Sequence, residues 1–582
     1  RQSFSRALRF FREMAPKHTA DEEQSLFPRL RQLGVAPLEL QVLEADHQEA
    51  YRWHGEVEAL GEIRLEPGWT APQRARYTEV IGAMDTLYRR HIDIEDNVIF
   101  PAAKRLLPPE QQEQVRREMV GRRAIQLAAL ALAALLLPWE AAAQAPVMEP
   151  VKVGSVNVQG SIRTRLETWD WFSSGQGDEA YAFSGTFARV SFSQVRKPFD
   201  WQLEFGAPIL LGLPDQATPA APVGPLGLGG NYFSANQNHR NAAMVFVKQG
   251  NLRFKNLFGD ERQSLKVGRY EFNDGTEVVP KDATLAALKR DRITQRLIGT
   301  FVWTHVQRSF DGFHYAANRK VSLHVLGALP TRGVFQVDGW GPLRTGFVYV
   351  SANRAQGNSD WRLFGVYYHD WRNVLKTDNR PVVARRADLT SDIRIGTYGG
   401  HLLHKVPLQK AGAVDILLWG AAQSGSWGRL SHRAAAGAAE IGWQPAGTPR
   451  LKPWLRGGYY YGSGDGNASD GRHGTFFQIL PTPRPYARFP FFNMMNNQDV
   501  HGALILRPSP KVTLKTEVHS LRLASGADQW LLGGGVFQPW SFGYIGRPSG
   551  VTSGSPGLAN LYDVSADWSA NAHVTLSAYY GH

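Results

Sequence analysis

A short apolar run near residue 130, flanked by basic and small residues, divides this chain into two parts. Arg122 and Arg123 precede the run, which extends over residues 124–137, and Ala-Gln-Ala follows it at 143–145. A charged start, an apolar stretch and a small-x-small site in this order are typical of a secretory signal peptide. At about 14 residues the run is shorter than the roughly 20 that a membrane-spanning helix needs. The alternatives to a signal peptide are a short buried helix and a membrane anchor.

Composition supports the same division. Residues 1–123 are rich in Glu, Gln, Leu and Arg, which favour helices, and residues 146–582 are rich in Gly, Ser, Val and aromatic residues, which favour strands and turns. We therefore expect a multidomain α and β chain, in which the signal-like segment 124–145 joins a helical domain to a β domain. The chain has no cysteine, which excludes disulfides and thiolate metal sites.

The first part contains a repeated motif. His18 is followed by Glu22 and then by Phe-Pro, and His91 is followed by Glu95 and then by Phe-Pro at the same spacing. Residues four apart lie on one face of a helix, so each copy offers an imidazole and a carboxylate to a common point.

A further helix, predicted over residues 37–60, carries His47 and, two turns later, His54. Imidazole and carboxylate ligands without thiolates suit non-haem iron or manganese, and facing helices of a bundle are the usual scaffold for a dinuclear site. A lone helical histidine is more often an ordinary surface or core residue. Two matching pairs with a histidine-bearing helix between them favour the metal site.

These motifs resemble the hemerythrin-like, HHE-type domains over residues 1 to about 123. The resemblance implies a four-helix bundle around a non-haem di-iron centre that binds oxygen or senses oxygen and iron. It also implies an earlier helix with another histidine, so we expect a partial bundle that lacks its first helix and is cytoplasmic if it is a separate protein. The implied ligands are His18, Glu22, His47, His91 and Glu95, with His54 a weaker candidate.

From about residue 153 the sequence alternates with the period of β-strands. In residues 511–519 the side chains of Val512, Leu514, Thr516 and Val518 alternate with Lys511, Thr513, Lys515, Glu517 and His519. In a soluble sandwich the apolar face forms the core, whereas in an outer-membrane barrel it faces lipid and the polar face lines the lumen. The preceding signal-like segment, about sixteen such strands and aromatic strand ends favour a large antiparallel transmembrane barrel of about 16–18 strands. The alternative is a soluble β-sandwich array or a propeller.

Charge suggests what such a barrel passes. The chain has 65 Lys and Arg against 52 Asp and Glu, a net charge of +13, and the excess falls after residue 123. Basic side chains inside a pore attract anions; alternatively, loop arginines bind lipopolysaccharide phosphates. The candidate pore and substrate residues are Arg163, Arg165, Glu167, Arg269, Arg296, Arg308, Asp311, Arg472, Arg484 and Arg488.

The segments 464–484 and 488–497, together with 296–299 and 308–312, resemble the alginate-export family of outer-membrane barrels. The resemblance spans about 150–582 and implies a large monomeric barrel, whose best-known member passes an anionic polysaccharide through an arginine-lined constriction. We expect partners to be outer-membrane lipid, lipopolysaccharide, anionic polysaccharide or small anions, and the barrel-assembly machinery, but not nucleic acid. We expect no cofactor in the barrel, and its closing strand to lie beyond residue 582.

Three further points concern function. Long Gly/Pro/Asn-rich stretches at 211–240 and 462–498 are expected as outer loops, some of which fold inward and narrow the pore. Asp465, Asn467 and Asp470 suggest a calcium loop, but the EF-hand pattern is incomplete and a solvated turn is favoured. The sequence has no assembled Ser/His/acid signature, so we do not expect an enzyme. The leading hypothesis is an outer-membrane channel for anions; the alternative is an oxygen- or iron-sensing di-iron protein, with the two parts encoded by fused or adjacent genes.

Overall fold

The structure is a computed structural model that divides into two units, Arg1–Trp139 and Glu140–His582. It describes residues 15–63, 70–108, 110–112, 114–115, 118–119, 150–171, 177, 179–219, 224–448, 450–482, 486–487, 493–533, 535–547 and 557–582. The signal-like segment 124–145 lies outside this part of the chain. Among the described residues, no helix is both long enough and apolar enough to cross a membrane.

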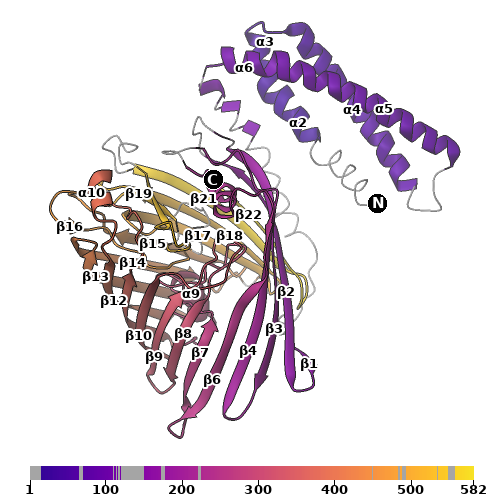
Figure 1. Ribbon diagram of the computed structural model, residues 1–582. Helices are drawn as coiled ribbons and strands as arrows, with labels where there is room; N and C mark the ends of the chain where they lie inside the picture. Colours follow the sequence, from indigo (N-terminus) through magenta and orange to yellow (C-terminus); the bar gives the residue numbers. More distant parts are fainter. Residues whose placement is uncertain are drawn as a thin grey trace. The chain divides into compact units, whose positions relative to one another are not determined.

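The first unit is helical (Figure 1). Its elements are α2 (Ala15–Asp21), η1 (Glu22–Leu26), α3 (Phe27–Gln32), α4 (Pro37–Ile63), α5 (Ala71–Ile94), η2 (Glu95–Ile99) and α6 (Phe100–Leu106). The predicted helix over 37–60 corresponds to α4. A capping box starts α5, because the Thr70 side chain accepts from the Gln73 backbone while Gln73 accepts from the Thr70 backbone.

Each copy of the repeated motif forms the same local structure. A π-helical turn begins at Glu22 and another at Glu95, and each leads into a new α-helix at the Phe-Pro pair. The Phe27 N–H donates to the Glu22 carbonyl, and the Phe100 N–H donates to the Glu95 carbonyl. The proline that follows has no N–H, so it cannot make the ordinary i→i−4 bond and the helix tolerates the wider turn.

The second unit is a 20-stranded sheet with a separate two-stranded sheet, β19 with β20. The strands are β1 (Val151–Val153), β2 (Val156–Asp170), β3 (Ala180–Val195), β4 (Phe199–Leu211), β5 (Ala242–Ala243), β6 (Phe246–Leu257), β7 (Asp260–Tyr270), β8 (Phe310–Ala317), β9 (Ser322–Pro330), β10 (Thr345–Gln356), β11 (Ser359–Asp370), β12 (Ile393–Pro407), β13 (Ala413–Trp427), β14 (Leu430–Gln444), β15 (Trp454–Gly462), β16 (Arg472–His473), β17 (Asn497–Ser509), β18 (Val512–Arg522), β19 (Trp530–Gly533), β20 (Tyr544–Arg547), β21 (Gly557–Ser569) and β22 (Thr575–Gly581). Three members, β1, β5 and β16, are short, which leaves 17 long strands in the described part.

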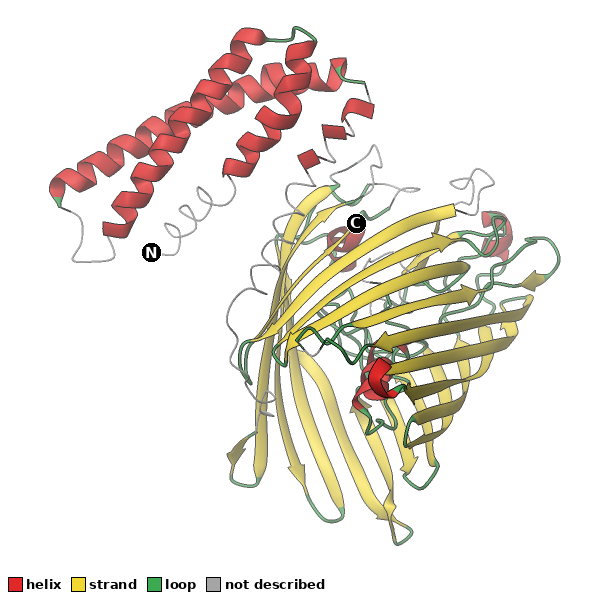
Figure 2. Cartoon of the chain, turned by 180° about the vertical axis from the view of Figure 1, so that it is seen from behind, coloured by secondary structure: helices red, strands yellow, loops and turns green. Residues whose placement is uncertain are grey.

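The long strands pair with their neighbours along the chain, in antiparallel order from β2 to β22. Figure 2 shows them as a strongly curved wall. Within the described residues the ladder has no pairing between β22 and β2. This architecture confirms the predicted fold class, a large antiparallel sheet of the outer-membrane barrel type.

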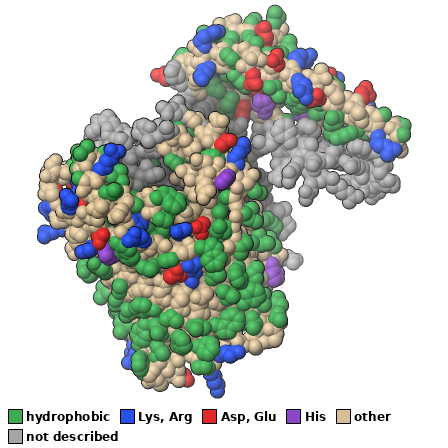
Figure 3. Space-filling model, in the orientation of Figure 1, with side chains coloured by type: hydrophobic (Ala, Val, Ile, Leu, Met, Phe, Trp, Pro, Cys, Tyr) green, Lys and Arg blue, Asp and Glu red, His purple; other side chains and the backbone are tan. Residues whose placement is uncertain are grey.

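The two faces of the wall have inverted polarity. In β18 Thr516 and Val518 are exposed while Glu517 and His519 are buried, as the alternation predicted. In β13 Leu418 is 47% exposed, whereas Asp415 is buried. Figure 3 shows hydrophobic side chains covering the outside of the strands. Apolar residues on the outer face and polar residues on the inner face are the arrangement that a lipid-embedded wall requires.

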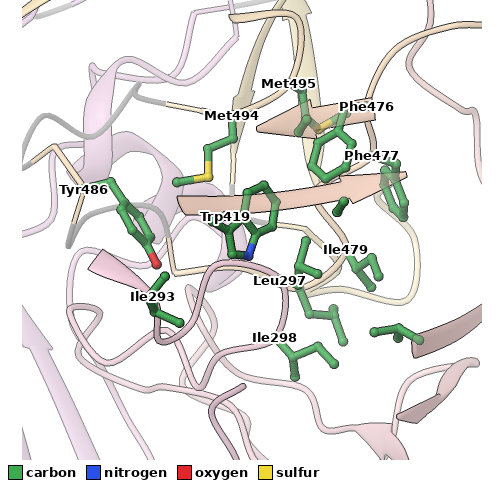
Figure 4. Close-up of a cluster of buried hydrophobic side chains, with 14 of the residues drawn as sticks. Ile293, Leu297, Ile298, Trp419, Phe476, Phe477, Ile479, Tyr486, Met494 and Met495 are labelled. Atoms are coloured by element: carbon green, nitrogen blue, oxygen red, sulfur yellow. The ribbon is translucent and has the colours of Figure 1, made fainter. Parts of the chain in front are cut away.

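Chain segments between the strands occupy the inside of the wall. Residues 271–309, which include α9 (Ala283–Arg292), and residues 474–482 are mostly buried and run side by side. Ile298 pairs with Leu480 in a parallel bridge, and the Leu480 N–H donates to the Leu297 carbonyl at 2.8 Å. Figure 4 shows the apolar cluster that they form with Trp419 of β13. Part of the expected outer loop 462–498 therefore lies inside the barrel wall.

The shorter helices lie in other connections. The connection 212–241 contains α8 (Gly227–Ala235), which is largely buried, whereas α10 (Val382–Ala387) has no buried side chain, and η3 (Gln409–Ala411) is a single turn. In the 465–472 connection the side chains of Asp465, Asn467 and Asp470 each accept from the backbone N–H two residues on. These are turns of the kind that the sequence favoured over a calcium loop.

Candidate functional site

The predicted metal ligands of the helical unit converge on one point. His18 of α2 and Glu22 of η1 meet His91 of α5 and Glu95 of η2, with one donor atom of each within 4.8 Å of the others. Three of these side chains are buried, and His18 is 54% exposed. The repeated motif therefore folds so that its two copies face each other.

His47 of α4 completes the cluster. Its Nε2 lies 3.1 Å from Oε2 of Glu22, and its ring centroid lies 4.8 Å from that of His91. His91 Nε2 lies 3.3 Å from Oε1 of Glu95. The helical unit thus holds three imidazoles and two carboxylates in one group, of which all but His18 are buried.

The chemistry of this group fits metal ions. Among the described residues, both Glu22 carboxylate oxygens, His47 Nε2 and Glu95 Oε1 are buried and make no hydrogen bond. Buried polar atoms are normally satisfied, so a converging set without hydrogen bonds is an arrangement that fits a bound cation. Burial, together with the neighbouring Glu95 carboxylate, raises the pKa of Glu22 to about 10. A cation placed between the carboxylates relieves this repulsion, and the mixed N/O donors suit iron or manganese.

Two residues around the cluster were missed in the sequence. Glu23 Oε1 lies 2.9 Å from His47 Nδ1, and Asp46 Oδ2 lies 3.5 Å from His91 Nδ1. A carboxylate at hydrogen-bond distance, as Glu23 is from His47, can fix the ring orientation of an imidazole that binds metal, whereas Asp46 and His91 make no hydrogen bond with each other. The sequence could have indicated Glu23 and Asp46, because each is adjacent in the chain to a predicted ligand. His54, the weaker candidate, lies elsewhere and contacts the Tyr88 hydroxyl at 2.6 Å.

In the β unit, part of the predicted pore set lies together on the inner face of β2. The Arg163 guanidinium donates to the carbonyls of Val302 and Thr304. The neighbouring Arg165 lies 2.8 Å from Oε1 of Glu167, which in turn lies 3.2 Å from Nε2 of His305. These contacts tie the inward segment 271–309 to the wall.

The other predicted pore residues are dispersed. Arg269 of β7 makes a bidentate pair with Asp311 of β8, at 2.7 and 2.8 Å. Arg296 is buried in the inward segment, with its guanidinium 4.5 Å from the Tyr486 ring centroid, and Arg308 donates to the Val536 carbonyl at 3.0 Å.

Arg472, in β16, is exposed, and Arg484 and Arg488 lie outside the described residues. The structure thus brings Arg163, Arg165 and Glu167 together but does not place the whole predicted set in one ring.

Several interior cations were missed. Arg362 of β11 is fully buried between Asp274 and Glu277, and Arg292 of α9 lies 2.9 Å from Glu440. Others are Arg189, Lys248, Arg372 and Arg456, each of which forms an ion pair with a carboxylate. The alternation of inward and outward side chains along a strand would have predicted the cations that lie on strands. Cations and carboxylates thus interleave along the described inner surface, a pattern suited to holding and passing polar solutes.

Comparisons with known proteins agree with both parts. A family model described as alginate export matches residues 215–582, and one described as hemerythrin HHE cation binding domain matches residues 1–103. No curated protein matches.

Solved outer-membrane proteins show a distant likeness. OccK1 (OpdK) of Pseudomonas aeruginosa is 10% identical, with 73% of this chain and 91% of that chain covered and a TM-score of 0.40. OccK9 (OpdG) of the same organism is 11% identical, with 74% and 94% covered and a TM-score of 0.41. OprB of Pseudomonas putida is 10% identical, with 63% and 89% covered and a TM-score of 0.36.

The alginate-export match covers more than half of the chain, and the structure of the matched region has the lipid-facing outer surface and polar interior expected of that family. The chain therefore belongs to the alginate-export family of outer-membrane β-barrel channels, and it carries a hemerythrin HHE domain in its N-terminal part.

Proposed function

We propose that the β unit is an outer-membrane channel that passes anionic solutes of the polyuronate class. The carrying observation is that Arg163 and Arg165 lie side by side on the inner face of β2 and reach the inward segment. The net charge of +13 supports the same polarity. Anions are drawn into the lumen electrostatically and diffuse past the inward segment. No covalent step is involved in this passage.

Single-channel recording across a salt gradient tests this proposal. We expect a reversal potential that indicates preference for anions, reduced in an Arg163→Gln/Arg165→Gln variant. Arg394→Gln is the matched control, because Arg394 is exposed and pairs with Asp392 at a strand end. A channel that prefers cations would contradict the proposal.

We also propose that the helical unit binds a non-haem di-iron centre and senses oxygen or iron. The supporting observation is the convergence of His18, Glu22, His47, His91 and Glu95, of which only His18 is exposed. When bound, iron would supply oxygen binding or redox chemistry. The five side chains would hold the ions, and Glu23, at 2.9 Å from His47 Nδ1, orients that imidazole. Iron analysis of the purified chain tests this proposal, and a protein that takes up no iron would contradict it.

The domain boundaries predicted from the sequence, 1–123, 124–145 and 146–582, remain part of the proposal. If residues 124–145 are a signal peptide, the barrel is a processed protein in the outer membrane and the helical unit stays behind. N-terminal sequencing and intact mass of the protein from an outer-membrane fraction decide this point. A mature start at Pro146 would support two neighbouring proteins, whereas an uncleaved chain would show a true fusion.

A further inference from the structure

A second group of metal-type side chains lies on the inner wall of the β unit. Asp499 and His501 of β17 and His519 of β18 point to the same side, and His501 and His519 are direct cross-strand partners. All three are at least nine-tenths buried. This group lies in the second unit of the chain and is not part of the helical cluster.

The three side chains are close enough to share one ion. His519 Nδ1 lies 2.9 Å from Oδ2 of Asp499, and His501 Nδ1 lies 3.9 Å from the same oxygen. Two ligands of one zinc-like ion are separated by at most about 4.2 Å, twice the metal–nitrogen bond length. The two separations from Asp499 fall within that limit, and the donor atoms of the two imidazoles lie within 4.8 Å of each other.

His501 provides the observation that points to a ligand. Its Nδ1 is buried, faces Asp499 and has no hydrogen-bond partner among the described residues. On the other side of the ring, Nε2 lies 3.7 Å from Oε2 of Glu440 and 2.9 Å from Arg292. Because a guanidinium only donates hydrogen bonds, Nε2 accepts from Arg292, and the proton on Nδ1 faces Asp499, where a bound metal ion would displace it.

Charge also favours a cation here. Within the described residues Asp499 forms ion pairs only with the two imidazoles and with no Lys or Arg. The inner wall offers a direct contrast at Asp360, which pairs with His401 at 2.6 Å and also with Lys289 at 2.9 Å. At Asp360 a lysine balances the buried carboxylate, whereas at Asp499 no lysine or arginine of the described residues does so through an ion pair.

We propose that Asp499, His501 and His519 form a site for a divalent transition-metal cation of the zinc class on the inner wall. Two imidazoles and a carboxylate leave a fourth position for water or a solute group. Glu517 and Asp563, which face each other on β18 and β21, place two more carboxylates beside His519. The ion would join β17 to β18 next to Arg292 of the inward segment.

The test measures zinc bound by the full chain carrying His91→Ala/Glu95→Ala, so that the helical cluster does not contribute. We expect one equivalent of bound Zn²⁺ in this background, which is lost on adding either His501→Gln or Asp499→Asn. His401→Gln is the matched control, because it removes a buried imidazole from the lysine-balanced Asp360 pair, and zinc content should not change.

A second measurement needs no substitution in the β unit. Co²⁺ added to the same background should give the visible absorption bands of a low-coordinate nitrogen/oxygen site, which an equivalent of Zn²⁺ displaces. No bands, or zinc content equal in the background protein and the His501→Gln variant, would overturn the proposal.

Discussion

His18 and Glu95 belong to different copies of the repeated motif, yet His18 Nε2 lies 3.6 Å from Oε1 of Glu95. The same nitrogen lies 3.6 Å from Oε1 of Glu22 within its own copy. One imidazole thus contacts both carboxylates. Both copies are needed to form the cluster, because each supplies only one imidazole and one carboxylate.

Removing one copy should therefore abolish iron loading. We expect His91→Ala/Glu95→Ala to lower the iron content of the purified chain to background, because only His18, Glu22 and His47 remain. His54→Ala is the control, since His54 contacts Tyr88 and lies apart from the cluster. Elemental analysis measures both variants. Unchanged iron in the double variant would refute the ligand assignment.

The inward segments should limit conduction, and Gly299 is the position that tests this. A Cβ at Gly299 would lie 2.4 Å from Oγ1 of Thr482 and 2.9 Å from Cβ of Gln295. Gly299→Ala therefore disturbs the contact between segment 271–309 and segment 474–482, because the Thr482 or the Gln295 side chain must shift. We expect higher single-channel conductance in this variant.

The control for this measurement is Gly420→Ala on the wall, where the nearest atom, the Ala436 carbonyl oxygen, lies 3.7 Å from an added Cβ. Conductance should match that of the unmodified channel. Equal conductance in all three proteins would show that these segments do not restrict the pore.

Buried ion pairs should dominate the stability of the interior. Arg362 lies 3.1 Å from Asp274 and 3.5 Å from Glu277, with no exposed side-chain surface. Arg362→Met leaves two buried carboxylates without their cation, which typically costs about 3–5 kcal/mol. Denaturant unfolding followed by tryptophan fluorescence measures the loss. Arg394→Met, which removes an exposed pair, should cost at most about 1 kcal/mol. Similar losses in the two variants would contradict this account.

The sequence predicted the local features of this chain well. Fixed spacing along a helix identified His18, Glu22, His91 and Glu95, and strand alternation identified the faces of β18, because both depend only on backbone period. The π-helical turns were not predicted, since they result from a proline in the next turn together with packing of the cluster.

Pore residues were harder to predict, because their surroundings depend on contacts between distant segments. Arg269 is paired with Asp311 across adjacent strands, and the register of β7 with β8 is enough to predict this pair. The partners of Arg163, by contrast, are carbonyls of residues 302 and 304, in a segment that folds into the barrel. Whether a long connection lies outside or inside the wall is decided by apolar packing such as that of Ile298 with Leu480, which has no periodic signature.

The inverted polarity of the wall gives a further prediction, for Leu418. This side chain is 47% exposed in the middle of β13, while its neighbours Leu417 and Trp419 are buried on the inner side. In a soluble protein an exposed Leu→Arg change usually shifts stability by no more than about 0.5 kcal/mol. On a lipid-facing surface it costs about 2–4 kcal/mol near the bilayer midplane, because the guanidinium must leave water.

We therefore expect Leu418→Arg to lower the free energy of unfolding in lipid vesicles by a few kcal/mol, about 2–4. Leu418→Met is the matched control, since it keeps an apolar side chain of similar size on the same face. Denaturant titration of vesicle-inserted protein measures both. Equal stability of the two variants would mean that this face is in contact with water and not with lipid, and the assignment of inside and outside would have to be reversed.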